Sequence, residues 1–286
     1  MTDGLVVVDK LAGWTSHDVV AKIRGIAGTR KVGHAGTLDP MATGVLVVGV
    51  GRATRLLGYL AATDKEYLAT IRLGVTTTTD DAEGDVVSEV DANGVTEDAV
   101  AAALEPLTGD IEQVPAAVSA VKVDGVRAYK RVRQGEEVDL VARPVTVSVF
   151  DVVARRGADI DVRVVCSSGT YVRALARDLG AALGVGAYLT SLRRTRVGSY
   201  TIDQARTLDE LTAELGVVPL ADVVASTFPR CDVDAETARR VAQGQRLSLP
   251  GVTGPTGVFA PDGVVVALVE PGDDGTTRSL VGFMAG

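Results

Sequence analysis

The sequence predicts an α+β fold, in which helices flank a mixed, largely antiparallel sheet and a small β-rich module follows at the C-terminal end. Three observations indicate this class. Segments with strand and helix periodicity follow one another in mixed order along the 286 residues. An Asp124-Gly125 pair between two alternating runs is a strong signal for an antiparallel hairpin. Short apolar runs separated by Pro- and Gly-rich turns fill the last segment, so we expect a body at 1–229 and a separate module at 230–286.

The first elements are two apolar strands on either side of an amphipathic helix. Residues 5–8 form an apolar run that is typical of a buried strand. Thr15 or Ser16 can cap a helix over 17–28, where apolar residues recur at helical spacing. The run GVLVVGVG at 44–51 is apolar on both faces, as in the middle of a sheet.

The later elements continue the mixed order. We expect a short helix at 53–64 and then a strand at 65–74, in which apolar and polar residues alternate. Residues 76–94 are polar, acidic and contain glycine. This composition predicts a surface loop that contributes little to the core. The other expected elements are helices at 96–109 and 170–184, two strands within 145–169, a linker at 228–234, a helix at 235–245, and strands at 257–263, 264–270 and 278–284.

The composition is that of an ordinary globular protein, with 46% hydrophobic and 23% charged residues. Cys166 and Cys231 are too few for a disulfide framework, and the two histidines do not combine with them in a metal-binding spacing. The chain has neither a charged leader followed by a long apolar stretch nor an apolar run that approaches a membrane span. We therefore expect a soluble, monomeric cytoplasmic protein that needs no metal.

The net charge of −8 argues against a nucleic-acid partner, but its distribution does not. Residues 61–120 hold 2 Lys/Arg against 13 Asp/Glu, whereas 1–60 hold 7 against 4 and 121–200 hold 14 against 8. Two basic segments therefore flank an acidic one, and phosphate groups respond to the local potential. An uneven charge pattern on a solvated surface explains the same counts, so both interpretations stay open.

Asp39 is the most distinctive candidate for chemistry, because it lies in a loop whose shape is fixed. The stretch GHAGTLDPMATG at 33–44 holds three glycines, Gly33, Gly36 and Gly44, and the conformationally restricted Pro40. A carboxylate in such a loop is a candidate for catalysis. A turn residue or a helix N-cap is the commoner role of an aspartate in such a loop, and this alternative stays open.

Three other chemistries fit the sequence less well. Gly49 and Gly51 follow an apolar run and weakly resemble a dinucleotide-binding turn, but the third glycine and the following acidic residue are missing. Nucleophilic Ser/His/Asp chemistry would need His17 or His34 as the base, and no GxSxG motif is present. Glycosidase chemistry would need a second carboxylate beside Asp39, and the sequence singles out none.

The stretch GHAGTLDPMATGVLVVGVGRATR at 33–55 resembles the catalytic motif of the TruB-type tRNA pseudouridine synthases. The resemblance covers the whole chain. Leu11, Ala116 and Val118 depart from residues that are usual in the family, and these departures affect packing positions more than chemistry. The other matching segments are VVDKLAGWTSHDVV at 7–20, DKEYLATIRLGVTTTTDDAEG at 64–84, VPAAVSAVKVDGVRAYKRVRQGE at 114–136, CSSGTYVRALARDLG at 166–180 and AYLTSLRRTRVG at 187–198.

The resemblance implies a pseudouridine synthase fold for the body and a PUA-like RNA-binding domain for residues 230–286. It implies that the partner is the T-stem-loop of tRNA, where uridine 55 is flipped out of the loop and isomerised to pseudouridine. This reaction breaks a C–N glycosidic bond and forms a C–C bond without any outside atom or energy source. We therefore expect no cofactor.

The resemblance also assigns roles to single residues. Asp39 would act at the sugar, as a nucleophile or as a base. Tyr67 would be the aromatic platform for the flipped base and relay the proton that leaves C5, although a cross-strand core tyrosine is the simpler alternative. Leu192 would line the pocket beneath the uracil, and His34 would help to open the T-loop.

Arg173 is expected to pair with Asp39 and keep it ionised, the alternative being a surface arginine. Tyr171 lies two residues before it, and in extended structure both side chains would point into the same pocket. Lys10 is expected to hold local structure or a phosphate rather than to perform chemistry. The expected phosphate contacts are Lys22, Arg24, Arg30, Lys31 and the basic cluster from Lys122 to Arg133.

Two competing functions stay open beside the isomerase. One is a tRNA-binding or tRNA-folding factor that keeps the scaffold without catalysis. The presence of Asp39, Tyr67 and Arg173 argues against it. The other is an unrelated hydrolase that uses Asp39, which lacks a partner base in the sequence.

Overall fold

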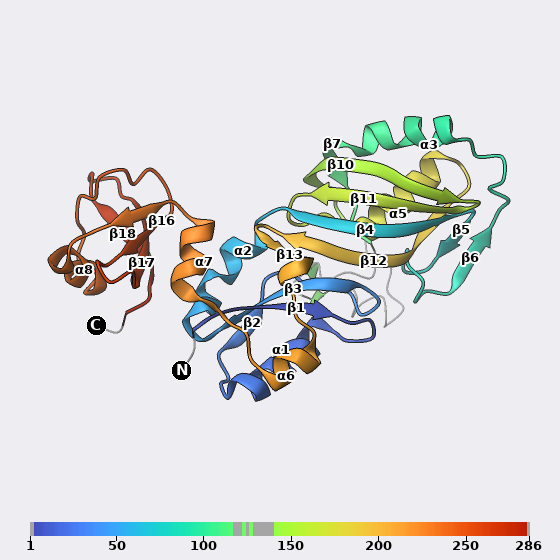
Figure 1. Cartoon of the computed structure of the whole chain (residues 1–286). Helices are drawn as coiled ribbons and strands as arrows, with labels where there is room; N and C mark the ends of the chain where they lie inside the picture. Colours follow the sequence, from blue (N-terminus) through green and yellow to red (C-terminus); the bar gives the residue numbers. More distant parts are fainter. Residues whose placement is uncertain (1–2, 117–121, 124–125, 128–139, 285–286) are drawn as a thin grey trace.

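The computed structural model describes residues 3–116, 122–123, 126–127 and 140–284. Its body is built on one ten-stranded sheet with the order β14-β1-β3-β12-β4-β11-β10-β7, to which β13 adds beside β12 and β2 beside β3 (Figure 1). Among the described pairings of this sheet only β12 with β3 is parallel. The predicted mixed, largely antiparallel sheet is therefore confirmed.

The body contains the helices and strands that were expected up to α5, together with others that the sequence analysis did not predict, among them β5 and β6 around the expected loop at 76–94. Its strands are β1 (Gly4–Lys10), β2 (Val32–His34), β3 (Thr43–Val50), β4 (Lys65–Leu73), β5 (Val75–Thr77), β6 (Val86–Glu89), β7 (Gly109–Gln113), β8 (Lys122–Val123), β9 (Val126–Arg127), β10 (Arg143–Arg156), β11 (Asp159–Cys166), β12 (Ala187–Val197), β13 (Tyr200–Thr201) and β14 (Val218–Pro219). Its helices are α1 (Ser16–Ala27), α2 (Leu57–Ala61), α3 (Glu97–Leu104), α5 (Val172–Ala182), α6 (Leu208–Ala213) and α7 (Leu220–Thr227), with short 3₁₀ turns at η1 (Gly51–Leu56), η2 (Glu105–Leu107) and η3 (Ile202–Gln204).

Strands β1 and β3 are buried on both faces, as the continuous apolar run of β3 predicts. Val6 and Leu46 belong to the core beneath α1 and α5, whereas Leu5 and Val47 belong to a second core beneath α2 and α7. Because side chains alternate between the faces of a strand, one strand supplies both cores. The loop of residues 35–42 leads directly into β3 and is therefore anchored at its end in this buried strand.

Strand β4 has one buried and one more open face. Tyr67 and Ile71 point into the main core, while Leu68 is 43% exposed. The alternation in the sequence predicts this arrangement. It brings Tyr67 to the interior side of the sheet.

Helix α1 begins at a complete capping box. The Thr15 hydroxyl accepts a hydrogen bond from the Asp18 amide, and the Asp18 carboxylate accepts one from the Thr15 amide. Of the two predicted caps, Thr15 is therefore the N-cap. Ser16 faces inward instead, where its hydroxyl bonds to Leu38 in the loop of residues 35–42.

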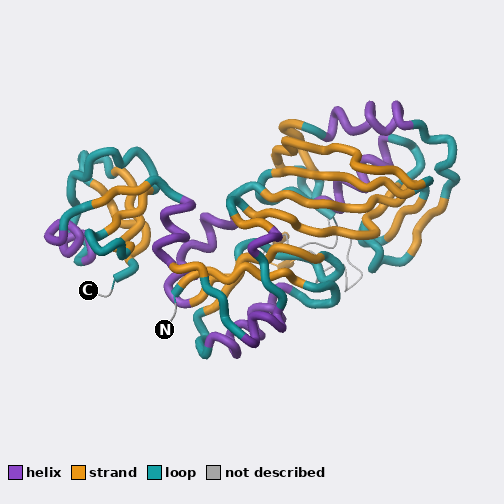
Figure 2. Tube along the Cα trace, viewed as in Figure 1, coloured by secondary structure: helices purple, strands orange, loops and turns teal. Residues whose placement is uncertain are grey.

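The C-terminal unit has its own four-stranded sheet with the order β15-β16-β17-β18. It consists of β15 (Arg230–Asp232), α8 (Ala235–Ala242), β16 (Thr256–Phe259), β17 (Val265–Pro271) and β18 (Thr277–Gly282). The prediction of a linker at 228–234 is wrong for its central residues. Arg230–Asp232 form β15, which pairs in parallel with β16. Figure 2 shows this strand-rich unit beside the body.

Helix α7 connects the two units and lies between them in Figure 1. Its Val224 packs in the same core as Phe259 and Leu268 of the C-terminal unit. Arg52 and Arg55 of η1 donate hydrogen bonds to the carbonyls of the chain end, at Phe283 and Gly282. The C-terminal unit is therefore packed on the body rather than tethered loosely to it.

Two further expectations concern the hairpin and the membrane. Strand β8 pairs with β9 in antiparallel register, while the turn residues Asp124 and Gly125 lie outside the described residues.

Among the described helices, none is long and apolar enough to cross a membrane.

Gly44 is expected to be irreplaceable, because β3 approaches β12 closely at this residue. Its φ is +97°, and a Cβ added there would lie 2.2 Å from the carbonyl oxygen of Arg194. The conformational strain and the overlap with main chain together predict that Gly44→Ala lowers the free energy of unfolding by about 3–5 kcal/mol. Denaturant unfolding measures this loss.

Gly13 provides the matched control, because its φ is +82° but no atom lies within 4 Å of an added Cβ. Gly13→Ala therefore carries the conformational strain alone, about 1–2 kcal/mol. Equal losses for the two variants would show that the close approach of β3 to β12 contributes nothing.

Candidate active site

A pocket of about 260 Å³ opens where the loop before β3, the inner face of β4 and β12, and the start of α5 meet. Five of the seven predicted site residues line it: Asp39, Tyr67, Tyr171, Arg173 and Leu192. A larger groove of about 900 Å³ between α3 and β10 includes none of the seven. Most of the residues that the sequence singles out for chemistry therefore lie together around the smaller of these two pockets.

The main chain on both sides of Asp39 is clamped. The Ser16 hydroxyl accepts a hydrogen bond from the Leu38 amide at 2.9 Å and donates one to the Leu38 carbonyl at 3.1 Å. The Lys10 ammonium donates to the Pro40 carbonyl at 3.2 Å. Because both flanking residues are held, the position of the Asp39 carboxylate is largely fixed before any substrate binds.

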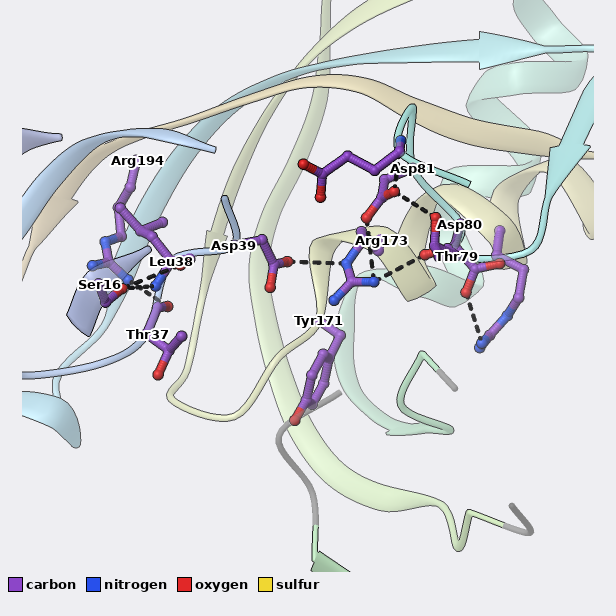
Figure 3. A network of polar contacts seen from close by, with 12 residues as sticks. Ser16, Thr37, Leu38, Asp39, Thr79, Asp80, Asp81, Tyr171, Arg173 and Arg194 are labelled. Carbon is purple, nitrogen blue, oxygen red and sulfur yellow. Dashed lines mark hydrogen bonds and ion pairs between the residues drawn. The ribbon is translucent and has the colours of Figure 1, made fainter. Parts of the chain in front are cut away.

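Arg173 lies beside Asp39, as expected, and its side chain is only 6% exposed. Its Nε is 3.0 Å from Asp39 Oδ2, and its terminal Nη1 is 3.3 Å from Asp81 Oδ2 (Figure 3). The same Nη1 donates to the carbonyl of Thr79 at 2.9 Å. The alternative of a surface arginine is therefore wrong, and the guanidinium lies between two carboxylates.

The second carboxylate, Asp81, was missed by sequence reasoning. It lies in the segment 76–94 that was expected to be a surface loop, yet Asp81 is 3% exposed. Its Oδ1 accepts hydrogen bonds from the Thr79 hydroxyl at 2.5 Å and from the Glu83 amide at 3.0 Å. The expectation of a surface loop is therefore wrong at Asp81. Polar side chains that bond to their own loop can be buried although the sequence shows no apolar periodicity.

The neighbouring Asp80 holds the same loop in an unusual conformation. Its φ is +61°, and it is the single non-glycine residue with positive φ in the described part of the chain. Its carboxylate lies 3.5 Å from Nη1 of Arg177, one turn beyond Arg173 on α5. Burial raises the pKa of Asp80, an effect that the Arg177 charge opposes. Two aspartate–arginine pairs thus attach this loop to α5.

The walls of the pocket are aromatic and apolar. Tyr67 on β4 is 8% exposed and Leu192 on β12 is 7% exposed. Burial raises the pKa of the Tyr67 hydroxyl above its usual value. A planar base entering the pocket would meet a tyrosine and a leucine rather than water.

Tyr171 reaches the pocket for a different reason from the one expected. It is the N-cap of α5, which begins at Val172, so it does not share an extended strand with Arg173. Its main chain is held by the buried amide of Gln113, which accepts from the Tyr171 amide at 2.8 Å and donates to its carbonyl at 3.1 Å. The start of the helix, rather than strand alternation, brings both side chains to the pocket.

Lys10 and His34 lie outside the pocket lining. Lys10 is fully buried, and its ammonium donates to the carbonyls of Leu11, Trp14 and Pro40. These contacts support the structural alternative, and burial lowers the pKa of Lys10 to about 8. His34 on β2 is half-buried, and its ring meets that of His17 edge to face at 5.5 Å.

Sequence reasoning also missed two buried cations of the pocket lining, Lys65 and Arg194. The Lys65 ammonium donates to the carbonyls of Ala61 and Thr63 at the end of α2, and burial lowers its pKa to about 8. The guanidinium of Arg194 donates to main-chain carbonyls as well. A Lys or Arg inside a strand carries no signal of burial in the sequence, because such residues are usually exposed.

Of the expected phosphate contacts, Lys22, Arg30 and Lys31 are exposed. Arg24 is also exposed but donates to the Val32 carbonyl at 3.1 Å. The side chains of Lys122 to Arg133 lie outside the described residues. Among the residues that the structure does describe, no three His, Cys, Asp or Glu side chains gather as a metal-binding group.

Solved structures share this fold over nearly the whole chain. One is the structure of an H/ACA RNP bound to a substrate RNA containing 2′-deoxyuridine, with a TM-score of 0.75 and 26% identity over 99% of this chain and 85% of that chain. Another is a Cbf5-Nop10-Gar1 complex, with a TM-score of 0.72 and 30% identity over 94% of this chain and 78% of that chain. The chain therefore shares its fold with proteins of these two complexes.

The family follows from the sequence comparisons. The model of the TruB family pseudouridylate synthase (N terminal domain) matches residues 24–172, and C-terminal models of the same family match 173–219 and 228–284. The chain is 62% identical to the tRNA pseudouridine synthase B of Thermobifida fusca over 99% of both chains. It is 60% identical to that of Streptomyces griseus over 98% of this chain and 97% of the relative. The chain belongs to the TruB family.

Asp81→Asn is expected to reduce turnover through Arg173. The neutral amide keeps the volume of Asp81 but loses the ion pair that orients the guanidinium, so Asp39 is less well placed. We expect single-turnover pseudouridine formation to slow by roughly 10- to 100-fold, with tRNA affinity within about 3-fold of the wild type.

Asp85→Asn is the control, because Asp85 is an exposed carboxylate of the same loop. It is expected to leave the rate unchanged. Equal rates for the Asp81 variant and the wild type would show that Arg173 needs no second carboxylate.

Proposed function

We propose that this protein isomerises uridine 55 in the T-loop of tRNA to pseudouridine. The observation that carries the proposal is the Asp39 carboxylate, which is fixed by main-chain clamps and by Arg173 at the wall of the pocket. The family match and the relatives named tRNA pseudouridine synthase B support the choice of RNA substrate. A factor that only binds tRNA would not require a carboxylate placed in this way.

The reaction breaks the N1–C1′ bond, turns the base over and joins C5 to C1′. Asp39 acts at the sugar. Its side chain is 35% exposed, so a substrate in the pocket can reach it. Arg173 fixes the direction of this carboxylate through its planar guanidinium. The walls of the pocket keep the detached uracil close to C1′ until the new bond forms.

The uridine must leave its RNA stack before it reaches Asp39. Tyr67 replaces the lost stacking with an aromatic surface, and Leu192 forms the floor beneath the uracil. Tyr171 closes the pocket from the start of α5. His34 lies outside the pocket lining, and we place it against the RNA loop that the flipped base leaves.

The exposed cations Lys22, Arg30 and Lys31 are proposed to contact RNA phosphates. We further propose that the chain divides into a catalytic domain at 1–229 and a PUA-like RNA-binding domain at 230–286. The second sheet and a separate apolar core that includes Val241 and Val258 support this division. The protein is proposed to act as a monomer in the cytoplasm.

An unmodified hairpin that reproduces the T-stem-loop tests the function directly, since flipping and loop recognition are local. Incubation with the protein is expected to produce pseudouridine at position 55, detected in a nuclease digest. The same digest of a full-length tRNA transcript is the positive comparison. If neither RNA gains pseudouridine, the proposed function is wrong.

Asp39→Asn is expected to abolish this product and to leave tRNA affinity within a few-fold of the wild type. One carboxylate among many RNA contacts contributes little to binding, whereas the reaction depends on it. Asp85→Asn is again the matched control and is expected to retain full turnover. Product formed by pure Asp39→Asn above the background without enzyme would contradict the role of Asp39.

A further inference from the structure

Two consecutive aspartates of the loop after β5 each pair with an arginine of α5. Asp81 pairs with Arg173 in the site described above, and Oδ2 of Asp80 lies 3.5 Å from Nη1 of Arg177. The two arginines are four residues apart, so they lie one above the other on the same face of the helix. The first pair orients the Asp39 carboxylate. The reaction proposed above gives the second pair no role.

The main chain at Asp80 is in the left-handed conformation, with a φ of +61°. In an extended segment neighbouring side chains point to opposite faces, so two consecutive aspartates could not both face one helix. The left-handed residue turns the chain, and both carboxylates lie on the side of Arg173 that is opposite Asp39 (Figure 3). Aspartate tolerates this conformation better than most residues, but it persists only where the surrounding contacts hold it.

Contacts with two other elements hold the loop at Asp80. Its main-chain carbonyl accepts a hydrogen bond from the Leu189 amide of β12 at 3.0 Å. Its side chain is 17% exposed and pairs with the Arg177 side chain, which is 31% exposed. The Arg177 guanidinium is anchored in turn, because its Nη2 donates to the Val114 carbonyl at 2.8 Å. The ion pair therefore joins the loop to a guanidinium that is also held from another side.

We propose that Asp80 is a positioning residue for uridine isomerisation, because its ion pair with Arg177 keeps the loop in this left-handed conformation. The conformation places Asp81 against Arg173, and Arg173 in turn orients the carboxylate that acts on the sugar. Asp80 need not touch the RNA, since it acts through these contacts. The proposal rests on the function proposed above.

The charges around Asp80 come from α5 and from its own loop. Burial raises the pKa of the Asp80 carboxyl, and the charges of Arg177 and Arg173 oppose this rise. The carboxylates of Asp178 and Asp81 raise the pKa further. Asp80 therefore takes up a proton at a higher pH than an ordinary aspartate, and its ion pair is lost as the pH falls through this raised pKa.

The test begins with variants of Asp80, assayed in single turnover on the T-stem-loop hairpin over a range of enzyme concentrations. Asp80→Asn keeps the side-chain volume and the tolerance for the left-handed conformation but loses the charge. Its maximal rate is expected to fall by about 10-fold, while the enzyme concentration at half-maximal rate stays within about 3-fold of the wild type. Asp80→Gly adopts the conformation without strain but lacks the ion pair, so it is expected to lose as much.

Variants of Arg177 complete a double-mutant cycle. Arg177→Met is expected to lower the maximal rate at least as much as Asp80→Asn, whereas Arg177→Lys, which keeps a positive charge, is expected to retain part of the rate. In the Arg177→Met background the Asp80→Asn change is expected to cost almost nothing more, since its partner is already gone.

Asp178→Asn is the matched control. Asp178 also pairs with Arg177, at 2.9 Å, but it belongs to α5 and not to the loop. The variant removes one carboxylate partner of the same guanidinium and leaves the attachment of the loop intact. It is expected to keep the wild-type rate.

The pH dependence separates the ion pair from a general loss of structure. Titration of Asp39 affects the wild type and Asp80→Asn alike, so the ratio of their rates reports the titration of Asp80. This ratio is expected to be largest near neutral pH. It is expected to approach one as the pH falls through the raised pKa of Asp80, because a protonated aspartic acid, like asparagine, forms no ion pair.

Three results would overturn the proposal. The first is a wild-type rate in Asp80→Gly, which would mean that the main-chain conformation suffices without the ion pair. The second is an equal loss from Asp80→Asn in the presence and absence of the Arg177 guanidinium. The third is a ratio of wild-type to Asp80→Asn rates that does not change with pH.

A measurement on the free protein does not depend on turnover. The Nε–H group of Arg173 is buried beside Asp39 and gives a proton–nitrogen NMR signal, which its loss in Arg173→Lys identifies. In Asp80→Asn the exchange of this proton with water is expected to be about 10-fold faster, because the loop that pairs with Arg173 opens more often. Asp178→Asn is expected to leave the exchange unchanged.

Equal exchange in the wild type and in Asp80→Asn would contradict the proposal. If Asp80→Asn fails to fold, Arg177→Lys is measured in its place, with the same direction expected and the same contradiction. This readout needs no pseudouridine, so it still decides how Asp80 acts on Arg173 if the wild type is inactive and the proposed function fails.

Discussion

The guanidinium of Arg173 lies between the carboxylates of Asp39 and Asp81, and the geometry of the pocket depends on this arrangement. It joins three segments that are distant in the sequence: the loop before β3, the loop after β5 and the first turn of α5. The Arg173 and Asp81 side chains are 6% and 4% exposed, so neither charge is well solvated. Loss of one partner from such a buried pair costs about 3–5 kcal/mol, mainly because the other charge is left uncompensated.

The remaining order of the site comes from side chains that bind main chain. Lys10 and Ser16 hold the residues on either side of Asp39, and Arg194 holds the carbonyls of Gly36 and Thr37. Carbonyl oxygens are acceptors whose position is set by the backbone, so these contacts fix the loop rather than one rotamer. A carboxylate presented by such a loop loses little freedom when substrate binds, which is the condition for fast intramolecular chemistry.

The sequence predicted those parts of the molecule that follow from local pattern. The two-sided burial of β3 and the inward Tyr67 of β4 both follow from apolar periodicity. The buried Asp81 and Arg194 could not be found in this way, since their burial depends on partners far along the chain. The pairing of β15 with β16 could not be predicted for the same reason, because it closes over a helix and a long turn region. For the site, the resemblance to a family named the residues, and the structure added the contacts that position them.

The central claim is that the clamped Asp39 carboxylate meets the sugar of a uridine that is flipped into this pocket. The most direct test is a crystal structure of the protein with a T-stem-loop hairpin that carries 5-fluorouridine at position 55, since fluorine replaces the C5 hydrogen that must leave. The account predicts the fluorinated base between Tyr67 and Leu192, with Asp39 bonded to the sugar or within about 3.5 Å of it and still paired with Arg173. A base that stays stacked in the RNA, or that occupies the groove between α3 and β10, would contradict it.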